Sequence, residues 1–160
     1  MKQTILAVDD EKSIVQLCTV MLEQAGFSVL SATKSSEALK ICKDHPGPID
    51  LLLTDLVMPP PEFALAASDN EFSNVHGHEL AVRALRLRKE LRVILMSGNI
   101  DQELAGYGIR RGDLPFLSKP FERKVFVDLV RKTLQELPPS VESLTAPLAA
   151  VAKFPDEWGH

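Results

Sequence analysis

Short apolar segments that alternate with stretches of helical spacing constrain the fold of this chain more than any other feature of its sequence. Each segment is only four to six residues long, too short for a typical buried helix. Strands of a parallel sheet that is covered on both faces read as nearly continuous apolar runs, whereas half-exposed strands alternate. The segments predict five strands, at residues 5–8, 27–31, 49–54, 93–96 and 114–117.

Apolar residues recur with helical spacing between and after these strands. The predicted helices cover residues 14–25, about 36–44, 77–91 and 126–137, with a poorly marked one after Asp101. In the last helix Leu137 is assigned to the apolar stripe, just before Pro138 ends the helix. The basic residues of the 77–91 helix are interpreted as a solvated face, namely Arg83, Arg86, Arg88 and Lys89. The fold class is α/β: a doubly wound, five-stranded parallel sheet with helices on both faces.

Composition narrows the functional classes. The chain has 160 residues, 45% hydrophobic and 25% charged, as in an ordinary globular domain. A net charge of −4 argues against a nucleic-acid surface. Cys18 and Cys42 have no metal-type spacing and are expected to be buried and unpaired. The four apolar residues before Asp9 are too few for a signal peptide or a membrane span, so a cytoplasmic location without membrane association is expected.

Polar residues that can carry chemistry follow the predicted strands directly. Asp9 and Asp10 follow the first strand, Asp55 the third and Ser97 the fourth, and Lys119 lies just past the fifth. The carboxyl ends of parallel strands meet at one edge of a sheet, so these groups should share one crevice. Three neighbouring carboxylates repel one another, and a hard divalent cation such as Mg²⁺ relieves the repulsion. A carboxylate nucleophile beside such an ion, with an ammonium to neutralise equatorial oxygens, suits phosphoryl transfer.

The same segments resemble the receiver domain of response regulators in two-component signalling, of the single-domain type. The resemblance covers about residues 3–137 and rests on four motifs in order: Ile5 to Glu11 (ILAVDDE), Leu53 to Pro59 (LTDLVMP), Ile94 to Gly98 (ILMSG) and Phe116 to Phe121 (FLSKPF). It implies a flavodoxin-like fold and a phosphoprotein of a phosphorelay. The only reactions catalysed would be the chain's own phosphorylation and dephosphorylation, so the protein would not be an enzyme in the usual sense.

The resemblance also implies roles for the acidic residues. Asp55 matches the phosphoacceptor and a ligand of Mg²⁺. Asp10 matches the direct metal ligand, Asp9 the ligand that acts through water, and Val57 the ligand that acts through its backbone carbonyl. Val57 and Asn99 match the positions that tune dephosphorylation. Because the side chain of Val57 is apolar and cannot hold an attacking water, we expect slow self-dephosphorylation.

Further roles concern the switch. Ser97 matches the hydroxyl that moves toward the phosphoryl group, and Lys119 the lysine that pairs with it, with a cis peptide bond to Pro120. Phe116 matches the switch aromatic, which would fill the space that Ser97 vacates. The implied partners are a histidine kinase or histidine phosphotransfer protein as donor and a downstream protein target. No direct DNA binding is expected, and the chain would be a monomer or a phosphorylation-linked dimer.

Two segments depart from the family pattern. The predicted receiver domain spans residues 1–138 with an enlarged loop at about 59–76, which could be a lid, a partner-binding loop or a solvated excursion. The tail at 139–160 is too short for an independent domain. In it Leu144, Leu148 and Val151 could line a short helix, with Pro147 near its first turn. Whether the tail docks on its own domain, binds a partner or is disordered stays open at this point.

Two alternative functions come from other classes. The first is a phosphorylation-independent interaction or adaptor domain that keeps the fold. The second is a phosphohydrolase of the haloacid-dehalogenase type, which uses a nucleophilic aspartate followed two residues later by a second aspartate as general acid. Here Glu11 follows Asp9 and Val57 follows Asp55 at that spacing, so the general acid has no good candidate.

Overall fold

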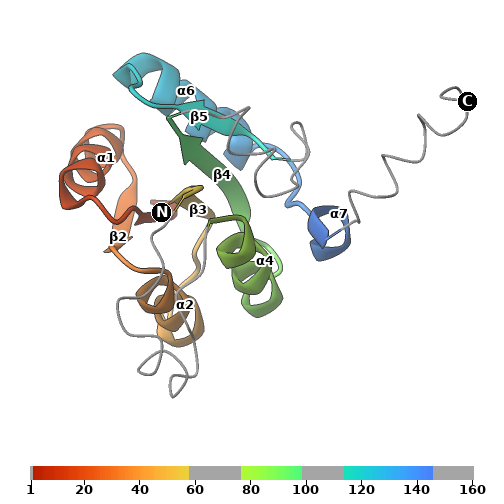
Figure 1. Ribbon diagram of the computed structural model, residues 1–160. Coiled ribbons are helices and arrows are strands. Elements are labelled where there is room, and N and C mark those ends of the chain that lie inside the picture. Colours follow the sequence, from red (N-terminus) through yellow and green to blue (C-terminus); the bar gives the residue numbers. More distant parts are fainter. Residues whose placement is uncertain (1, 58–76, 99–113, 146–160) are drawn as a thin grey trace, which may run out of the picture.

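The computed structural model describes residues 2–57, 77–98 and 114–145. A five-stranded sheet lies at its centre, with helices packed on both faces (Figure 1). The strands are β1 (Thr4–Val8), β2 (Ser28–Ala32), β3 (Leu51–Asp55), β4 (Arg92–Ser97) and β5 (Phe116–Ser118). The helices are α1 (Lys12–Gln24), α2 (Ser35–Asp44), α4 (Gly77–Leu87), α6 (Arg123–Leu134) and α7 (Val141–Thr145).

All strand pairs are parallel, in the order β2-β1-β3-β4-β5. β3 is buried over its full length because it lies between β1 and β4 and is covered above and below. The register pairs Ile5 with Leu51 and Leu51 with Arg92, which aligns the carboxyl ends of the three strands. The predicted fold class is therefore confirmed, and the continuous apolar runs reflect coverage of both faces.

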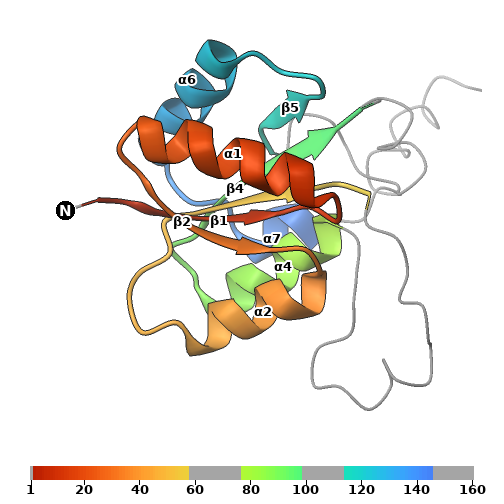
Figure 2. The ribbon, with the colours of Figure 1, turned by 90° about the vertical axis from the view of Figure 1, so that its left-hand side faces the viewer.

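Alternate residues of each strand enter different cores, as the pleat of a strand requires. Leu6, Leu52 and Leu95 pack with α2 and α4 on one face of the sheet. Ile5, Leu53 and their neighbours pack with α1 and α6 on the other, as the two layers in Figure 2 show. Cys18 and Cys42 are buried and unpaired, one in each core, as predicted.

Arg88 corrects the expectation of a purely solvated basic face on the 77–91 helix. Its guanidinium donates hydrogen bonds to the carbonyl oxygens of Cys42, His45 and Gly47 at 2.7, 2.5 and 2.8 Å. These carbonyls belong to the last turn of α2 and the loop that follows, where carbonyls lack partners within the helix. A planar fork of five donors can satisfy several of them at once, so Arg88 ties the end of α4 to the end of α2.

The carboxyl end of α6 differs from the prediction. The helix ends at Leu134, and Leu137 lies beyond it with 90% of its surface exposed. Proline disfavours helical geometry in the residue before it, so Pro138 keeps Leu137 out of the helix and off its apolar stripe. The weak helix predicted after Asp101 falls outside the described residues, as does the enlarged loop at 59–76.

The first residues of the tail dock on the domain. α7 packs against α4, and Leu144 is 4% exposed within the same core as α2 and α4. A short helix is present at Val141–Thr145, whereas the predicted helix through Leu148 and Val151 falls outside the described residues except for Leu144. Residues 146–160 lie outside the described part of the chain. Among the described residues, no helix is both long and apolar enough to cross a bilayer.

Replacing Arg88 with methionine is expected to lower the free energy of unfolding by about 1–3 kcal/mol, because three partly buried carbonyls lose a charged donor. Urea titration followed by circular dichroism measures the change. Arg123→Met is the control: Arg123 is exposed at the start of α6, and its replacement should change stability by no more than about 0.5 kcal/mol. Equal losses in both variants would show that Arg88 does not tie the two helices together.

Candidate functional site

The side chains predicted to share a crevice all come from one edge of the sheet. Asp9 and Asp10 directly follow β1, Asp55 is the last residue of β3, and Ser97 is the last residue of β4. Lys119 is the first residue after β5. β1, β3, β4 and β5 are consecutive parallel neighbours. The topology therefore gathers residues that are up to 110 positions apart in the chain.

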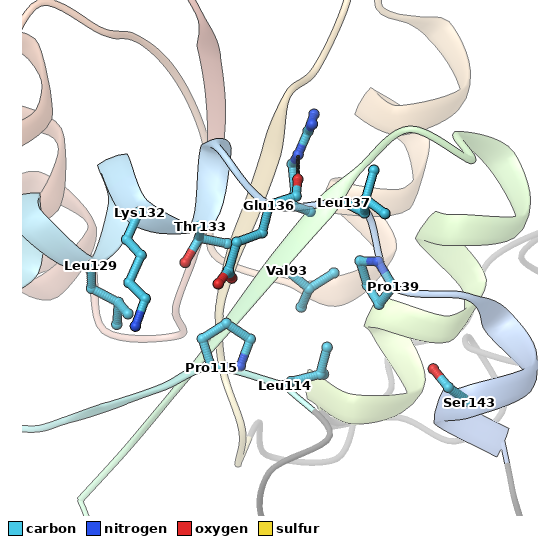
Figure 3. Close-up of a pocket in the computed structure, with 11 residues that line it drawn as sticks. Val93, Leu114, Pro115, Leu129, Lys132, Thr133, Glu136, Leu137, Pro139 and Ser143 are labelled. Atoms are coloured by element: carbon cyan, nitrogen blue, oxygen red, sulfur yellow. Dashed lines mark hydrogen bonds between the residues drawn. The ribbon is translucent and has the colours of Figure 1, made fainter.

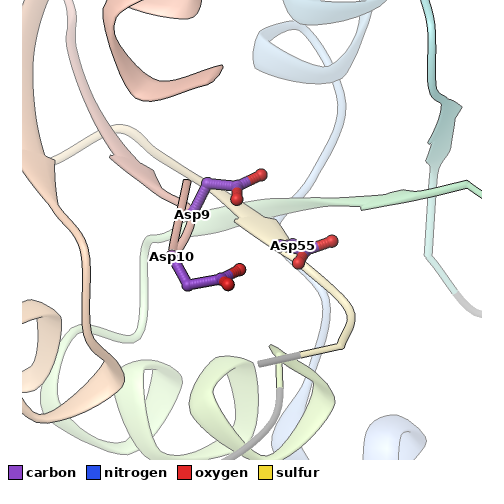
Figure 4. A group of neighbouring side chains, drawn as sticks. All are labelled: Asp9, Asp10 and Asp55. Carbon is purple, nitrogen blue, oxygen red and sulfur yellow. The ribbon is translucent and has the colours of Figure 1, made fainter. Parts of the chain in front are cut away.

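Three carboxylates form the centre of this site. Carboxylate oxygens of Asp9, Asp10 and Asp55 lie within 4.8 Å of one another, and Figure 4 shows the three groups extending in the same direction. Asp9 is fully buried and Asp55 is 7% exposed, whereas Asp10 is exposed. An all-oxygen, anionic donor set with one member open to solvent fits a hard divalent cation such as Mg²⁺.

Lys119 connects two of the carboxylates. Its Nζ donates to Asp9 Oδ2 at 2.7 Å and to Asp55 Oδ1 at 3.1 Å. The backbone N–H of Lys119 donates to the carbonyl oxygen of Ser97 at 2.9 Å, which fixes the residue after β5 against the end of β4. The peptide bond between Lys119 and Pro120 is cis. The ammonium is thus placed by both its side chain and its backbone.

Burial and charge act in opposite directions on the central groups. Burial, with a further contribution from the charge of Asp9, raises the pKa of Asp55 from 3.8 to about 6, although the Lys119 ammonium opposes the shift. For Lys119, burial alone would lower the pKa. The hydrogen bonds and charges of Asp9 and Asp55 together outweigh it and raise the pKa above the ordinary value. Lys119 therefore stays charged, and Asp55 would ionise more readily if a cation joined the cluster.

Backbone contacts hold the acidic residues in place. The N–H of Glu11 donates to Asp9 Oδ1 at 2.9 Å, which orients this buried carboxylate. The hydroxyl of Thr54 donates to the carbonyl oxygen of Asp55 at 3.0 Å. The N–H of Leu56 donates to the carbonyl oxygen of Met96 at 2.8 Å, so β3 remains paired with β4 just beyond Asp55.

Gly77 has a structural role that sequence reasoning did not find. In the sequence it was only the first residue of the predicted helix at 77–91. A Cβ at this position would lie 2.1 Å from the carbonyl oxygen of Asp55, and the N–H of Gly77 donates to the carbonyl oxygen of Leu56 at 2.9 Å. Only glycine allows the first turn of α4 to pack this closely on the end of β3. The glycine itself was visible in the sequence, but the contact that requires it was not.

The other predicted residues occupy the surroundings of this centre. Ser97 is fully buried at the end of β4. Phe116 and Val57 are partly buried and pack against the core that α2 and α4 form with the sheet. Asn99 lies outside the described residues, so its role in dephosphorylation stays a prediction. The structure brings Asp9, Asp55 and Lys119 into direct contact.

Fold and site together define an α/β protein with an acidic, lysine-bridged centre at the carboxyl edge of its parallel sheet. The family model for the response regulator receiver domain matches residues 5–131, and the chain belongs to this family.

Among curated proteins, the chain is 30% identical over 136 residues to the DNA-binding transcriptional regulator NtrC of Azospirillum brasilense. The aligned region covers 85% of this chain and 25% of that protein. It is 25% identical over 123 residues to the response regulator SaeR of Staphylococcus epidermidis, covering 77% of this chain and 46% of that protein. The chain thus spans between a quarter and about half of the length of these relatives.

Solved structures show the same architecture. A response regulator receiver protein from Sinorhizobium medicae superimposes with a TM-score of 0.65 at 25% identity, covering 83% of this chain and 94% of that one. The receiver domain of the hybrid histidine kinase CckA superimposes with a TM-score of 0.61 at 28% identity, covering 82% and 99%. Both are receiver domains by description, in agreement with the family model.

The raised pKa of Asp55 predicts that its ionised carboxylate destabilises the folded state when no metal ion is bound. Between pH 3.8 and about 6 the folded chain retains a proton that the unfolded chain has lost, so stability decreases as the pH rises through this range. Without divalent ions, Asp55→Asn should therefore increase the free energy of unfolding by about 1–3 kcal/mol near pH 8, with a smaller gain near pH 4. Urea titration in a metal chelator measures both values.

Asp44→Asn on the exposed surface of α2 is the control and should give no such pH-dependent gain. A stability gain for Asp55→Asn that is the same at both pH values would show that charge repulsion in the acidic cluster is not its cause.

Proposed function

We propose that this chain is a phosphorylation-activated switch that accepts a phosphoryl group on Asp55 from a histidine kinase or a histidine phosphotransfer protein. The observation that carries this proposal is the cluster of three carboxylates within 4.8 Å of one another, bridged by the Lys119 ammonium. Membership of the receiver-domain family supports the same chemistry. Asp9, Asp10 and Asp55, with the backbone carbonyl of Val57, would hold Mg²⁺.

In the proposed reaction, a carboxylate oxygen of Asp55 attacks the phosphorus atom of phosphohistidine. The new O–P bond forms as the N–P bond breaks, and the donor imidazole leaves with the electron pair and takes up a proton. When bound, Mg²⁺ neutralises carboxylate charge and the charge on the phosphoryl oxygens. Lys119 lies 3.1 Å from the acceptor carboxylate, so a small movement of its side chain would pair the ammonium with a phosphoryl oxygen.

The proposed switch shifts the population between two states rather than creating a new fold. Ser97 would be drawn to the phosphoryl group, and Phe116 would move into the space that it leaves. Support comes from their positions: Ser97 is buried at the edge that holds Asp55, and Phe116 is only partly buried on the neighbouring strand. The changed surface would bind a protein target. A net charge of −4 supports a protein rather than DNA as the partner.

Incubation with acetyl phosphate and Mg²⁺ should add one phosphoryl group to the purified chain, as detected by intact-protein mass spectrometry. Asp55→Ala should abolish the adduct because it removes the nucleophile, while Asp44→Ala on the exposed surface of α2 should retain it. An adduct of equal yield in Asp55→Ala would refute Asp55 as the acceptor. The absence of an adduct in the parent chain would favour the phosphorylation-independent adaptor, and repeated turnover of phosphate esters would favour a phosphohydrolase.

The lifetime of the adduct should be long, on the order of minutes or more, because the apolar side chain of Val57 cannot position an attacking water. Decay is followed by mass spectrometry after removal of acetyl phosphate with Mg²⁺ present. Val57→Asn should shorten the lifetime by supplying a polar group, and Val57→Ile should leave it unchanged. A parent half-life of seconds would contradict the proposed role of Val57.

A further inference from the structure

The link between α6 and α7, residues 135–140, presents an unusually exposed apolar side chain. Leu137 is 90% exposed, more than any other large hydrophobic residue of the described chain. Pro138 and Pro139 follow it. Their rings fix the φ angles of the two prolines and restrict the backbone conformation of Leu137. The side chain is therefore held outward by a stiff link and does not relax onto the end of α6. Such an arrangement offers an apolar contact at low cost in conformational entropy.

A groove of about 700 Å³ runs between this link and the carboxyl-terminal half of α4. Its wall is largely apolar, with two basic residues and one acidic residue at the rim; the lining residues are Leu85, Arg86, Lys89, Leu137, Pro138, Pro139, Ser140, Val141 and Glu142. A second cavity, of about 390 Å³, shares Leu137 and Pro139 with the groove, and Figure 3 shows both residues on the link above it. The larger groove suits a peptide with apolar anchors and net negative charge.

The chain itself contains a segment that combines apolar anchors with negative charge. Residues 154–158 read Phe-Pro-Asp-Glu-Trp, so two aromatic side chains flank an acidic pair. Phe154 and Trp158 supply large apolar anchors, and Asp156 and Glu157 complement the two basic residues at the rim of the groove. Residues four positions apart share one side of a helix or an extended strand, so either conformation would let both aromatic residues face the groove.

The tether is long enough for the segment to reach the groove. α7 ends at Thr145, and the eight residues between Thr145 and Phe154 can span up to about 26–29 Å when extended. The first residues of α7 already form part of the groove wall, so the tether begins at the end of a five-residue helix that borders the groove. A tether of this length gives a high effective concentration, which favours binding within one chain over binding between chains.

We propose that residues 154–158 dock into the groove between α4 and the α6–α7 link, with Phe154 and Trp158 against its apolar wall and the acidic pair against Arg86 and Lys89. None of the residues that line the groove belongs to the acidic cluster, so this contact requires no phosphoryl group on Asp55. A partner peptide of the same chemistry, aromatic and acidic, would compete for the groove.

Trp158 is the only tryptophan of the chain, so intrinsic fluorescence of the full-length protein reports on this contact directly. A synthetic peptide of residues 146–160 supplies the reference for the undocked state. The intact protein should emit at a shorter wavelength than the peptide and be quenched less by acrylamide. Emission and quenching that match the peptide would overturn the proposal.

Groove variants should release the tryptophan. Leu137→Asp and the double variant Arg86→Glu with Lys89→Glu should both shift the emission to that of the peptide. All three positions are exposed, so the fold should be retained, which circular dichroism checks. Val20→Asp, at a 52% exposed position of α1 on the opposite face of the sheet, is the control and should leave the emission unchanged.

A charge exchange tests the ionic part of the contact. Asp156→Lys with Glu157→Lys should restore the shorter emission wavelength in the chain that carries glutamates at positions 86 and 89. An equal shift in the control and groove variants, or failure of the charge exchange to restore the emission, would overturn the assignment to this groove. An emission shift that grows with protein concentration would overturn the intramolecular contact in favour of a second copy.

Discussion

The rest of the structure depends on the electrostatic balance between three carboxylates and a single ammonium at the carboxyl edge of the sheet. Asp9 and Asp55 are almost fully buried, and Lys119 contacts both. Two buried negative charges would be costly without that partner, and the exposed carboxylate of Asp10 leaves the cluster with an excess of negative charge. The Lys119 ammonium offsets part of the cost of burying Asp9 and Asp55, but the cluster of three carboxylates still carries more negative than positive charge. This combination of properties suits a site that takes up a cation and then a phosphoryl group.

The fold maintains this balance by fixing backbones rather than side chains alone. β3 is buried on both faces, so Asp55 is held at the end of a rigid element. Gly77 lets α4 pack directly on the carbonyl of Asp55, and Arg88 ties the other end of α4 to α2. α4, whose first residue packs on the acceptor residue, is therefore held at both ends.

The sequence predicted the parts of the fold that follow from burial and topology. The continuous apolar strands and the polar residues that follow them were enough to predict the parallel sheet and the meeting of Asp9, Asp55 and Lys119. It did not predict contacts that depend on three-dimensional neighbours with no local pattern. The partners of Arg88 are backbone carbonyls, which no side-chain pattern encodes. Leu137 fits a helical stripe by spacing, but Pro138 ends the helix first.

Asp10 differs from its two neighbours in being open to solvent, and this has a kinetic consequence. A cation bound by the cluster would have one flank in contact with water, so it could exchange without the opening of any strand or helix. Its residence time would then be governed by the replacement of water molecules around the ion.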